Sequence, residues 1–132
     1  MPSDRDQIRT LIERWAKAVQ ACDLAGVLED HTDDIVMFDV PPPEGGARGM
    51  AAYRATWEPF FGYIRKGAIF RIVSLEVTAG ADIAYAYALL RCGMPDHLAQ
   101  NPDERLRLTL GLRKEDGRWR VAHEHHSFAL KD

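Results

Sequence analysis

The order of helices and strands along this chain of 132 residues limits its fold more than any other feature. In the first half, apolar residues recur every three or four positions in segments that end at polar, glycine or proline residues, a pattern typical of helices. Three helices are expected there, at about 4–22, 23–31 and 49–63. Ser3 or Asp4 should cap the first helix, and Pro59 should kink the third or end it early.

The second half of the chain is rich in residues that favour strands. Together with one short strand before the proline-rich loop 41–46, the expected strands are 35–40, 68–78, 83–92, 105–114 and 119–128. Helices followed by a run of long antiparallel strands predict an α+β domain, in which the helices pack on one face of a curved sheet. Its length predicts one domain over residues 1–132.

Composition narrows the classes of partner. The net charge is −3 and the chain has no basic run, so no nucleic-acid partner is expected. No apolar run approaches the roughly 20 residues of a membrane span, and the first residues are polar, so neither a membrane partner nor a signal peptide is expected. Cys22 and Cys92 are too few for a disulfide framework, which favours reduced thiols and a cytoplasmic location.

The strand at 119–128 concentrates more titratable side chains than any other segment. Side chains alternate between the two faces of a strand, so His123 and His125 should share one face, and Glu124 and His126 the other. Imidazoles can exchange protons near neutral pH, which makes His123 and His125 candidate catalytic residues on a pocket wall. Glu124 and His126 are then expected on the outer face, where they would suit a dimer contact.

Several motifs together resemble a known family. They are ACDLAGVL at 21–28, Phe38-Asp39, Gly49 before an aromatic helix, LRLTLGLRK at 106–114, DGRW at 116–119 and the HEHHS end. The chain resembles, over nearly its whole length, the SnoaL-like, ketosteroid-isomerase-related branch of the NTF2-like superfamily. The resemblance implies a cone in which a strongly curved antiparallel sheet wraps around the N-terminal helices and encloses a pocket. It also implies a homodimer formed through the outer face of the sheet.

Within this resemblance, three positions correspond to the functional groups of ketosteroid isomerase, an Asp base with a Tyr and a protonated Asp that bind the oxyanion. Asp39 is similar in placement to the base. Trp15 stands where the tyrosine is expected, and Thr109 where the protonated aspartate is expected. Trp and Thr can donate hydrogen bonds but cannot act as proton-transferring acids near pH 7, which argues against steroid isomerisation.

The predicted catalytic residues are therefore Asp39, His123 and His125. The predicted substrate-binding residues are Trp15, Phe38, Tyr53, Trp57, Arg91, Arg107 and Thr109. Each has a structural alternative: Asp39 can hold the loop that follows it, the imidazoles can be structural, and the arginines can be solvated. No cofactor or metal is expected, although a metal site built from Asp39, His123 and His125 is a weaker alternative.

The turn at 115–117 leaves the register of the last two strands open. A three-residue loop with Gly117 in the left-handed conformation would place Arg107 and Thr109 opposite His123 and His125. A two-residue turn would place leucines there instead. An inward arginine would indicate an anionic ligand or a carboxylate partner.

Two functions remain open from the sequence. The first is a protein with a small-molecule pocket for a partly apolar, even anionic, substrate. It would carry out cofactor-free proton transfer as an isomerase, dehydratase or hydrolase. The second is a non-catalytic ligand-binding or assembly module of the same fold.

Overall fold

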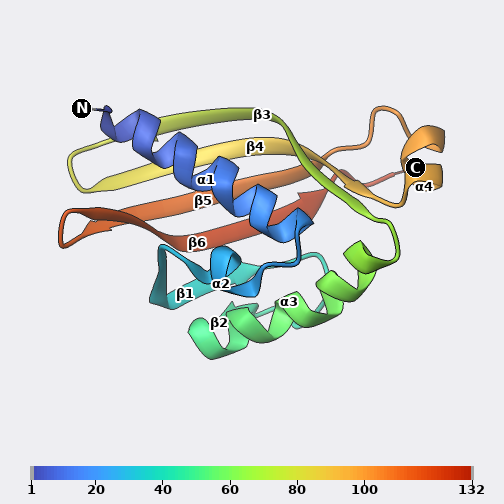
Figure 1. The fold of residues 1–132 in the computed structure, drawn as a ribbon, viewed down its shortest axis with the longest axis horizontal. Coiled ribbons are helices and arrows are strands. Elements are labelled where there is room, and N and C mark those ends of the chain that lie inside the picture. The colour runs from blue at the N-terminus through green and yellow to red at the C-terminus, as the bar shows by residue number, and fades with distance from the viewer. Residues whose placement is uncertain (1, 132) are drawn as a thin grey trace.

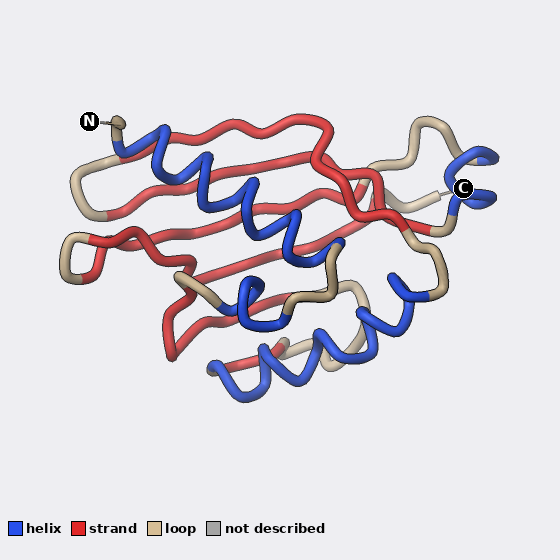
Figure 2. Tube along the Cα trace, in the orientation of Figure 1, coloured by secondary structure: helices blue, strands red, loops and turns tan. Residues whose placement is uncertain are grey.

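The computed structural model describes residues 2–131, and it is an α+β structure as predicted (Figure 1). Its elements in chain order are α1 (Asp4–Gln20), α2 (Leu24–Leu28), β1 (His31–Phe38), β2 (Ala47–Arg48), α3 (Met50–Arg65), β3 (Ile69–Ala79), β4 (Ile83–Gly93), α4 (Pro95–Gln100), β5 (Leu106–Glu115) and β6 (Arg118–Phe128). Helix α1 lies across one face of the curled sheet, and α3 lies beside β1 and β2 (Figures 1 and 2).

The sheet has six strands in the order β2-β1-β6-β5-β4-β3. Strands β3 to β6 form the expected antiparallel meander, and β2 is antiparallel to β1. Strand β1 runs parallel to β6, so the first strand of the chain lies beside the last. This pairing brings the end of β1, and Asp39 just beyond it, next to the histidine-rich end of β6.

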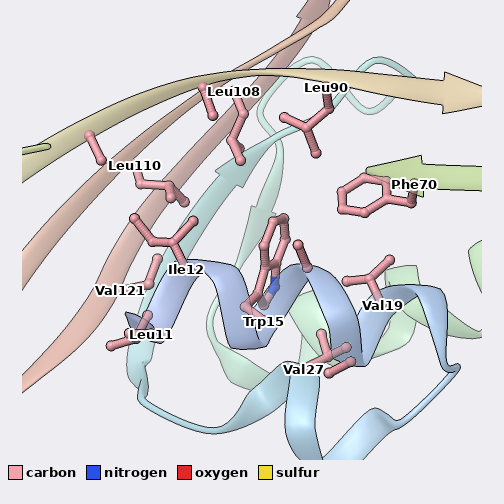
Figure 3. Close-up of a cluster of buried hydrophobic side chains, with 14 of the residues drawn as sticks. Leu11, Ile12, Trp15, Val19, Val27, Phe70, Leu90, Leu108, Leu110 and Val121 are labelled. Atoms are coloured by element: carbon pink, nitrogen blue, oxygen red, sulfur yellow. The ribbon is translucent and has the colours of Figure 1, made fainter. Parts of the chain in front are cut away.

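Helix α1 forms where the apolar periodicity predicts it. Ser3 caps its first turn, because the side-chain oxygen accepts a hydrogen bond from the Asp6 N–H at 3.1 Å. Its buried face packs against leucines of β5 and against β6, with Trp15 at the centre of the cluster (Figure 3). This face of the sheet is called the inner face below, and the opposite face the outer face.

Helix α3 continues through Pro59 to Arg65, so of the two expected effects of Pro59, a kink or an early end, the early end is wrong. A proline inside a helix costs roughly 3 kcal/mol. The buried face of α3 carries four large side chains, and burying each contributes about 1.5–3 kcal/mol, enough to offset that cost. These side chains are Tyr53, Trp57, Phe61 and Ile64. The short helix α4 was expected as a loop; Pro95 occupies its first turn, where a missing N–H costs little.

The β5–β6 hairpin decides which side chains of β6 face inward. Its turn has two residues, Asp116 and Gly117, both with positive φ (51° and 79°), and Glu115 pairs with Arg118. Farther along, Leu112 pairs with Val121 but Gly111 pairs with His123, so the register shifts by one residue at Ala122. This β-bulge reverses the alternation of side chains in the rest of β6.

Because of the bulge, the predicted faces of β6 are wrong for its second half. Trp119 and Val121 are buried, but so are Glu124 and His126, which regular alternation would place on the opposite face. His123 and His125 belong instead to the outer face. On β5 the leucines point inward, whereas Arg107 and Thr109 are exposed.

Candidate functional site

A hollow of about 260 Å³ lies between α3, the end of β1 and the inner face of the sheet. We call it the α3 hollow. Most of its wall is apolar, and no lysine or arginine lines it within the part of the chain that the structure describes. The main apolar lining residues are Met37, Trp57, Phe60, Phe70, Leu106 and Phe128. Its polar lining comes chiefly from Asp39, Thr56, Cys92 and His126.

Asp39 lies where the sequence predicts it, immediately after β1 on the wall of the hollow, with its side chain 33% exposed. Oδ1 accepts a hydrogen bond from the Val40 N–H at 2.8 Å, so the carboxylate does help to hold the loop. The same oxygen lies 3.8 Å from Nδ1 of His126. Holding the loop and lining the hollow are therefore compatible for this residue.

His126 is the buried imidazole of the hollow. Its Nε2 lies 3.0 Å from Oε1 of Glu124, and the edge of its ring meets Trp15 at a centroid distance of 6.5 Å. Burial lowers the pKa of His126, but the hydrogen bond and negative charge of Glu124, with the charge of Asp39, outweigh burial and raise it. The interior therefore favours the charged imidazole.

Glu124 is completely buried and lies between two imidazoles. Oε1 accepts the hydrogen bond from His126, and Oε2 lies 3.3 Å from Nε2 of His31 on β1. Burial raises the pKa of Glu124, but the hydrogen bonds and charges of His126 and His31 more than compensate and lower it to about 2. Glu124 is therefore a carboxylate throughout the neutral pH range.

These contacts fix the orientation of His126. Glu124 is ionised and can only accept hydrogen bonds, so Nε2 of His126 carries a hydrogen. The other ring nitrogen, Nδ1, is then the one that faces Asp39. A buried carboxylate orients the imidazole of a catalytic dyad in the same way. Glu124 holds Nε2 of His126, and Nδ1 is left free to exchange a proton.

The predicted catalytic residues His123 and His125 do not reach the hollow. His123 Nδ1 lies 2.6 Å from the Val36 carbonyl oxygen, and both rings meet Phe38 edge to face on the outer side of the sheet. Phe38 therefore belongs to the outer face as well and does not line the hollow. The prediction that these side chains would form a pocket wall is wrong, and the bulge at Ala122 is the cause.

The predicted aromatic residues divide into two layers. Trp57 lines the hollow, whereas Trp15 and Tyr53 are buried behind it. Trp15 contacts the rings of Trp57 and His126 and so supports both. Tyr53 stacks on His31, and its hydroxyl lies 3.1 Å from His31 Nε2.

Neither predicted arginine enters the hollow. Arg91 donates hydrogen bonds to the carbonyl oxygens of Leu98, Asn101 and Glu104 at 2.7–2.9 Å, which ties α4 and the following loop to β4. Arg107 lies on the outer face and donates to the Ser127 hydroxyl at 3.1 Å. The expected reason for an anionic ligand is therefore missing.

Thr109 is exposed on the outer face opposite His125, so it does not occupy the place of the oxyanion aspartate. The inward side chains beside it are Leu108 and Leu110. Thr109 faces outward because β5 alternates regularly and turns its leucines toward the inner face.

Sequence reasoning missed His31, Glu124 and His126 as interior groups. The Asp116-Gly117 pair is a typical signal of a two-residue hairpin turn, but no residue type marks the bulge at Ala122. The parallel pairing of β1 with β6 brings His31 toward Glu124, and that pairing is not a local property of the sequence.

No group of three or more His, Cys, Asp or Glu side chains among residues 2–131 is arranged to hold a metal ion. The alternative set of Asp39, His123 and His125 is divided between the two faces of the sheet. Within the same range, no helix has the length and apolar character needed to cross a membrane.

Solved structures agree with this fold. An NTF2-like protein of unknown function from Pseudomonas putida KT2440 is 36% identical, with a TM-score of 0.82, and the match covers 97% of this chain and 96% of that one. An NTF2-like protein with a cystatin-like fold from Novosphingobium aromaticivorans is 20% identical, with a TM-score of 0.76 and coverage of 95% and 81%. A putative ketosteroid isomerase from Shewanella frigidimarina is 21% identical, with a TM-score of 0.73 and coverage of 89% and 92%.

No curated protein matches the chain. The family model for the SnoaL-like domain matches residues 8–131, which is nearly the whole chain. Together with the helices packed inside a curled, unclosed sheet, this match confirms the predicted relationship. The chain belongs to the SnoaL-like domain family, within the NTF2-like proteins whose structural neighbours include a putative ketosteroid isomerase.

Proposed function

We propose that this protein is a cofactor-free enzyme that moves a proton on a small, neutral and largely apolar organic molecule bound in the α3 hollow. One observation carries the proposal: a buried imidazole, His126, is held by Glu124 on one side and faces Asp39 at 3.8 Å on the other, at the wall of an apolar hollow. Paired acid and base groups in such a setting favour proton transfer.

Each group has a distinct role in this proposal. The Asp39 carboxylate takes a proton from carbon next to an electron-withdrawing group. His126, charged and with Nε2–H bound to Glu124, donates a hydrogen bond or a proton from Nδ1 to the oxygen on which negative charge develops. The gap of 3.8 Å between the two groups is too long for a direct hydrogen bond, so a substrate atom can come between them. Trp57 and the phenylalanines of the hollow would exclude water from the reacting atoms.

The lining of the hollow supports a neutral substrate. Its side chains supply no cation other than His126, and Glu124 already neutralises that charge. A substrate with its own negative charge would lie beside the Asp39 carboxylate without compensation. Isomerisation, dehydration and ring opening all begin with the proton removal proposed here.

The test uses 5-nitrobenzisoxazole, a neutral aromatic carbon acid that opens to a coloured phenolate when a base removes one ring proton. Wild-type protein should accelerate this opening, and Asp39→Asn should reduce the rate about 10²- to 10⁴-fold. Asp33→Asn is the matched control, because Asp33 is an exposed carboxylate on β1 that does not line the hollow. Quenching of tryptophan fluorescence measures binding of the probe separately, since Trp57 lines the hollow.

Equal rates for wild type and Asp39→Asn, with the probe bound by both, would overturn the enzymatic proposal. They would favour the second candidate, a non-catalytic ligand-binding or assembly module. One observation supports that candidate: Trp15 and Thr109, at the two positions where the resemblance to ketosteroid isomerase implies oxyanion acids, cannot act as proton-transferring acids near pH 7.

We also propose that the protein is a cytoplasmic homodimer. Four large side chains alternate along the outer face of β4, namely Ile83, Tyr85, Tyr87 and Leu89, and all are at least 39% exposed. An apolar stripe of this kind suits a self-complementary contact between two copies. Cys22 and Cys92 are both free thiols, in keeping with a reducing compartment.

Light scattering tests the dimer. Wild-type protein should have the mass of two chains, and Tyr87→Glu the mass of one, because a charge would be buried in the contact. Ala55→Glu introduces the same charge at an exposed residue of α3, which packs beside β1 and β2 and not β4, and it should leave the dimer intact. A wild-type mass of one chain would contradict the proposal.

A further inference from the structure

Glu124 contacts two imidazoles, and the proposed mechanism uses one of them. His126 faces the α3 hollow, whereas His31 is 4% exposed and does not line it. Both ring Nε2 atoms lie within 3.3 Å of the same carboxylate, one on each oxygen.

The other contacts of His31 show which nitrogen holds its proton. Nδ1 lies 2.8 Å from the carbonyl oxygen of Glu29, and a carbonyl can only accept, so Nδ1 carries a hydrogen. Nε2 then has two states. In the neutral ring it accepts a hydrogen bond from the Tyr53 hydroxyl at 3.1 Å, and in the charged ring it donates toward Glu124.

Tyr53 can serve either state of His31. Burial, followed by the charge of Glu124, raises the pKa of Tyr53 well above its usual range, so the phenol keeps its hydrogen and remains a donor. Its hydrogen bond can go to His31 when that ring is neutral, or toward Glu124 when His31 is charged. Nε2 of His31 therefore faces a donor, the Tyr53 hydroxyl, and an acceptor, the Glu124 carboxylate.

Charge balance makes the two imidazoles competitors. Both rings contact the same carboxylate, so a positive charge on one ring repels a positive charge on the other across Glu124. Asp39 can relieve only His126, because it lies on the hollow side at 3.8 Å from that ring. Protonation of His31 should therefore disfavour protonation of His126, and the reverse.

We propose that His31 is a positioning residue that, through Glu124, sets whether His126 meets a ligand as a charged acid or as a neutral base. The proposal rests on the proposed function only in naming His126 as the group that meets the ligand. The coupling between protonation of His31 and protonation of His126 is a property of the ligand-free protein. The titratable groups around His126 are Glu124 on β6, Asp39 after β1, and Cys92 on β4 and Tyr63 on α3, which line the same hollow, with His31 and Tyr53 beyond Glu124.

The experiment follows each imidazole by NMR in protein with isotope-labelled histidine, without any ligand, between about pH 4 and pH 9. In wild-type protein the His126 signal should titrate in two coupled steps. His31→Gln removes the competing imidazole but keeps a donor for Glu124. In this variant His126 should titrate in a single step, with its midpoint raised by about one pH unit.

Two further variants give different results if the proposal is right. Glu124→Gln removes the shared carboxylate, so the His126 midpoint should fall and the coupling should disappear. Tyr53→Phe removes only the hydroxyl that favours neutral His31, so His31 should gain protonation relative to His126. This variant keeps the stacked ring and provides the test if His31→Gln does not fold.

His97→Gln is the matched control, because His97 pairs with Glu104 on the surface at 2.9 Å, far from β6 in its contacts. It should leave the His126 curve unchanged. An unchanged His126 midpoint in both His31→Gln and Tyr53→Phe would overturn the proposal. If wild-type protein does not accelerate the opening of 5-nitrobenzisoxazole, only the proposed function is contradicted, because the titrations are measured without that probe.

Discussion

Two pairs of histidines on neighbouring strands have opposite environments in this protein. His31 and His126 are buried on the inner face around Glu124, where each contacts a carboxylate oxygen. His123 and His125 lie on the outer face against Phe38, and the one hydrogen bond that their rings make within residues 2–131 joins His123 to a backbone carbonyl.

The comparison shows that residue type alone says little about the chemistry of a histidine. An imidazole beside a buried carboxylate has a defined orientation and a raised pKa, as His126 has. An imidazole on an open sheet face keeps its contact with water. For the histidines of β6, the residue that separates the two cases is Ala122, because its bulge turns His126 inward and His123 and His125 outward.

Deleting Ala122 would break this comparison most severely. Without the bulge, the rest of β6 either slips and exposes Glu124 and His126 or keeps its faces by straining the pairing with β5. We expect a loss above about 4 kcal/mol in the free energy of unfolding, measured by urea denaturation. Ala122→Gly keeps the number of residues and should cost about 1 kcal/mol or less. Similar losses for the two variants would show that the bulge does not determine the faces.

Removing the inner carboxylate should have the next largest effect. Glu124→Ala leaves two buried imidazoles without their shared partner, and breaking a buried pair of this kind costs about 3–5 kcal/mol. Glu104→Ala is the surface counterpart, since Glu104 pairs with His97 and Lys131 near solvent, and such pairs contribute about 1 kcal/mol or less. Urea denaturation of both variants at neutral pH measures the difference. A loss below about 1 kcal/mol in Glu124→Ala would contradict the role given to the buried charge.

The pH dependence of stability gives a smaller and sharper test. The pKa of folded Glu124, about 2, lies below its unfolded value near 4.3. Its contribution to the free energy of unfolding is therefore complete above about pH 4.3 and is lost as the pH falls toward 2. The pKa of His126 is raised, so its contribution is present below about pH 6.5 and is lost as the pH rises through the folded pKa.

The inner pair should therefore stabilise the protein most between about pH 4.5 and 6.5, and up to about 3 kcal/mol of this stabilisation should be lost toward acid. The difference in unfolding free energy between wild type and Glu124→Gln, measured across the pH range, isolates this contribution. His125→Gln on the outer face should leave the wild-type profile unchanged. A pH-independent difference between wild type and Glu124→Gln would show that the pair is not ionised as described.

Much of the fold could be predicted from local patterns. The apolar spacing in 4–22 predicted α1, and the strand-rich segments predicted β3 to β6 within a few residues. Helix α4 and the two-residue β2 were missed because short elements carry weak periodicity. Pro59 was given too much weight, since the packing of Trp57 and Phe61 keeps α3 intact beyond it.

The site was predicted less well than the fold. Asp39 and Trp57 line the hollow as expected, because one follows a buried strand and the other belongs to the apolar face of α3. Phe38, His123, His125, Arg107 and Thr109 lie on the opposite face of the sheet. The predictions for the four residues of β5 and β6 depended on a register that the sequence left open, whereas Phe38 faces outward because it alternates with the inward Met37 on β1.

The sequence by itself determined the long helices and strands and their order, because helix and strand periodicity and turn residues are local properties of the chain. Its motifs carried the resemblance to the family. The tertiary structure decided which histidines are interior, because that depends on the bulge at Ala122 and on the pairing of β1 with β6. Both arise from contacts between segments far apart in the chain. A shift of one residue in such a pairing moves a side chain from one face of the sheet to the other, and with it from water to a buried carboxylate.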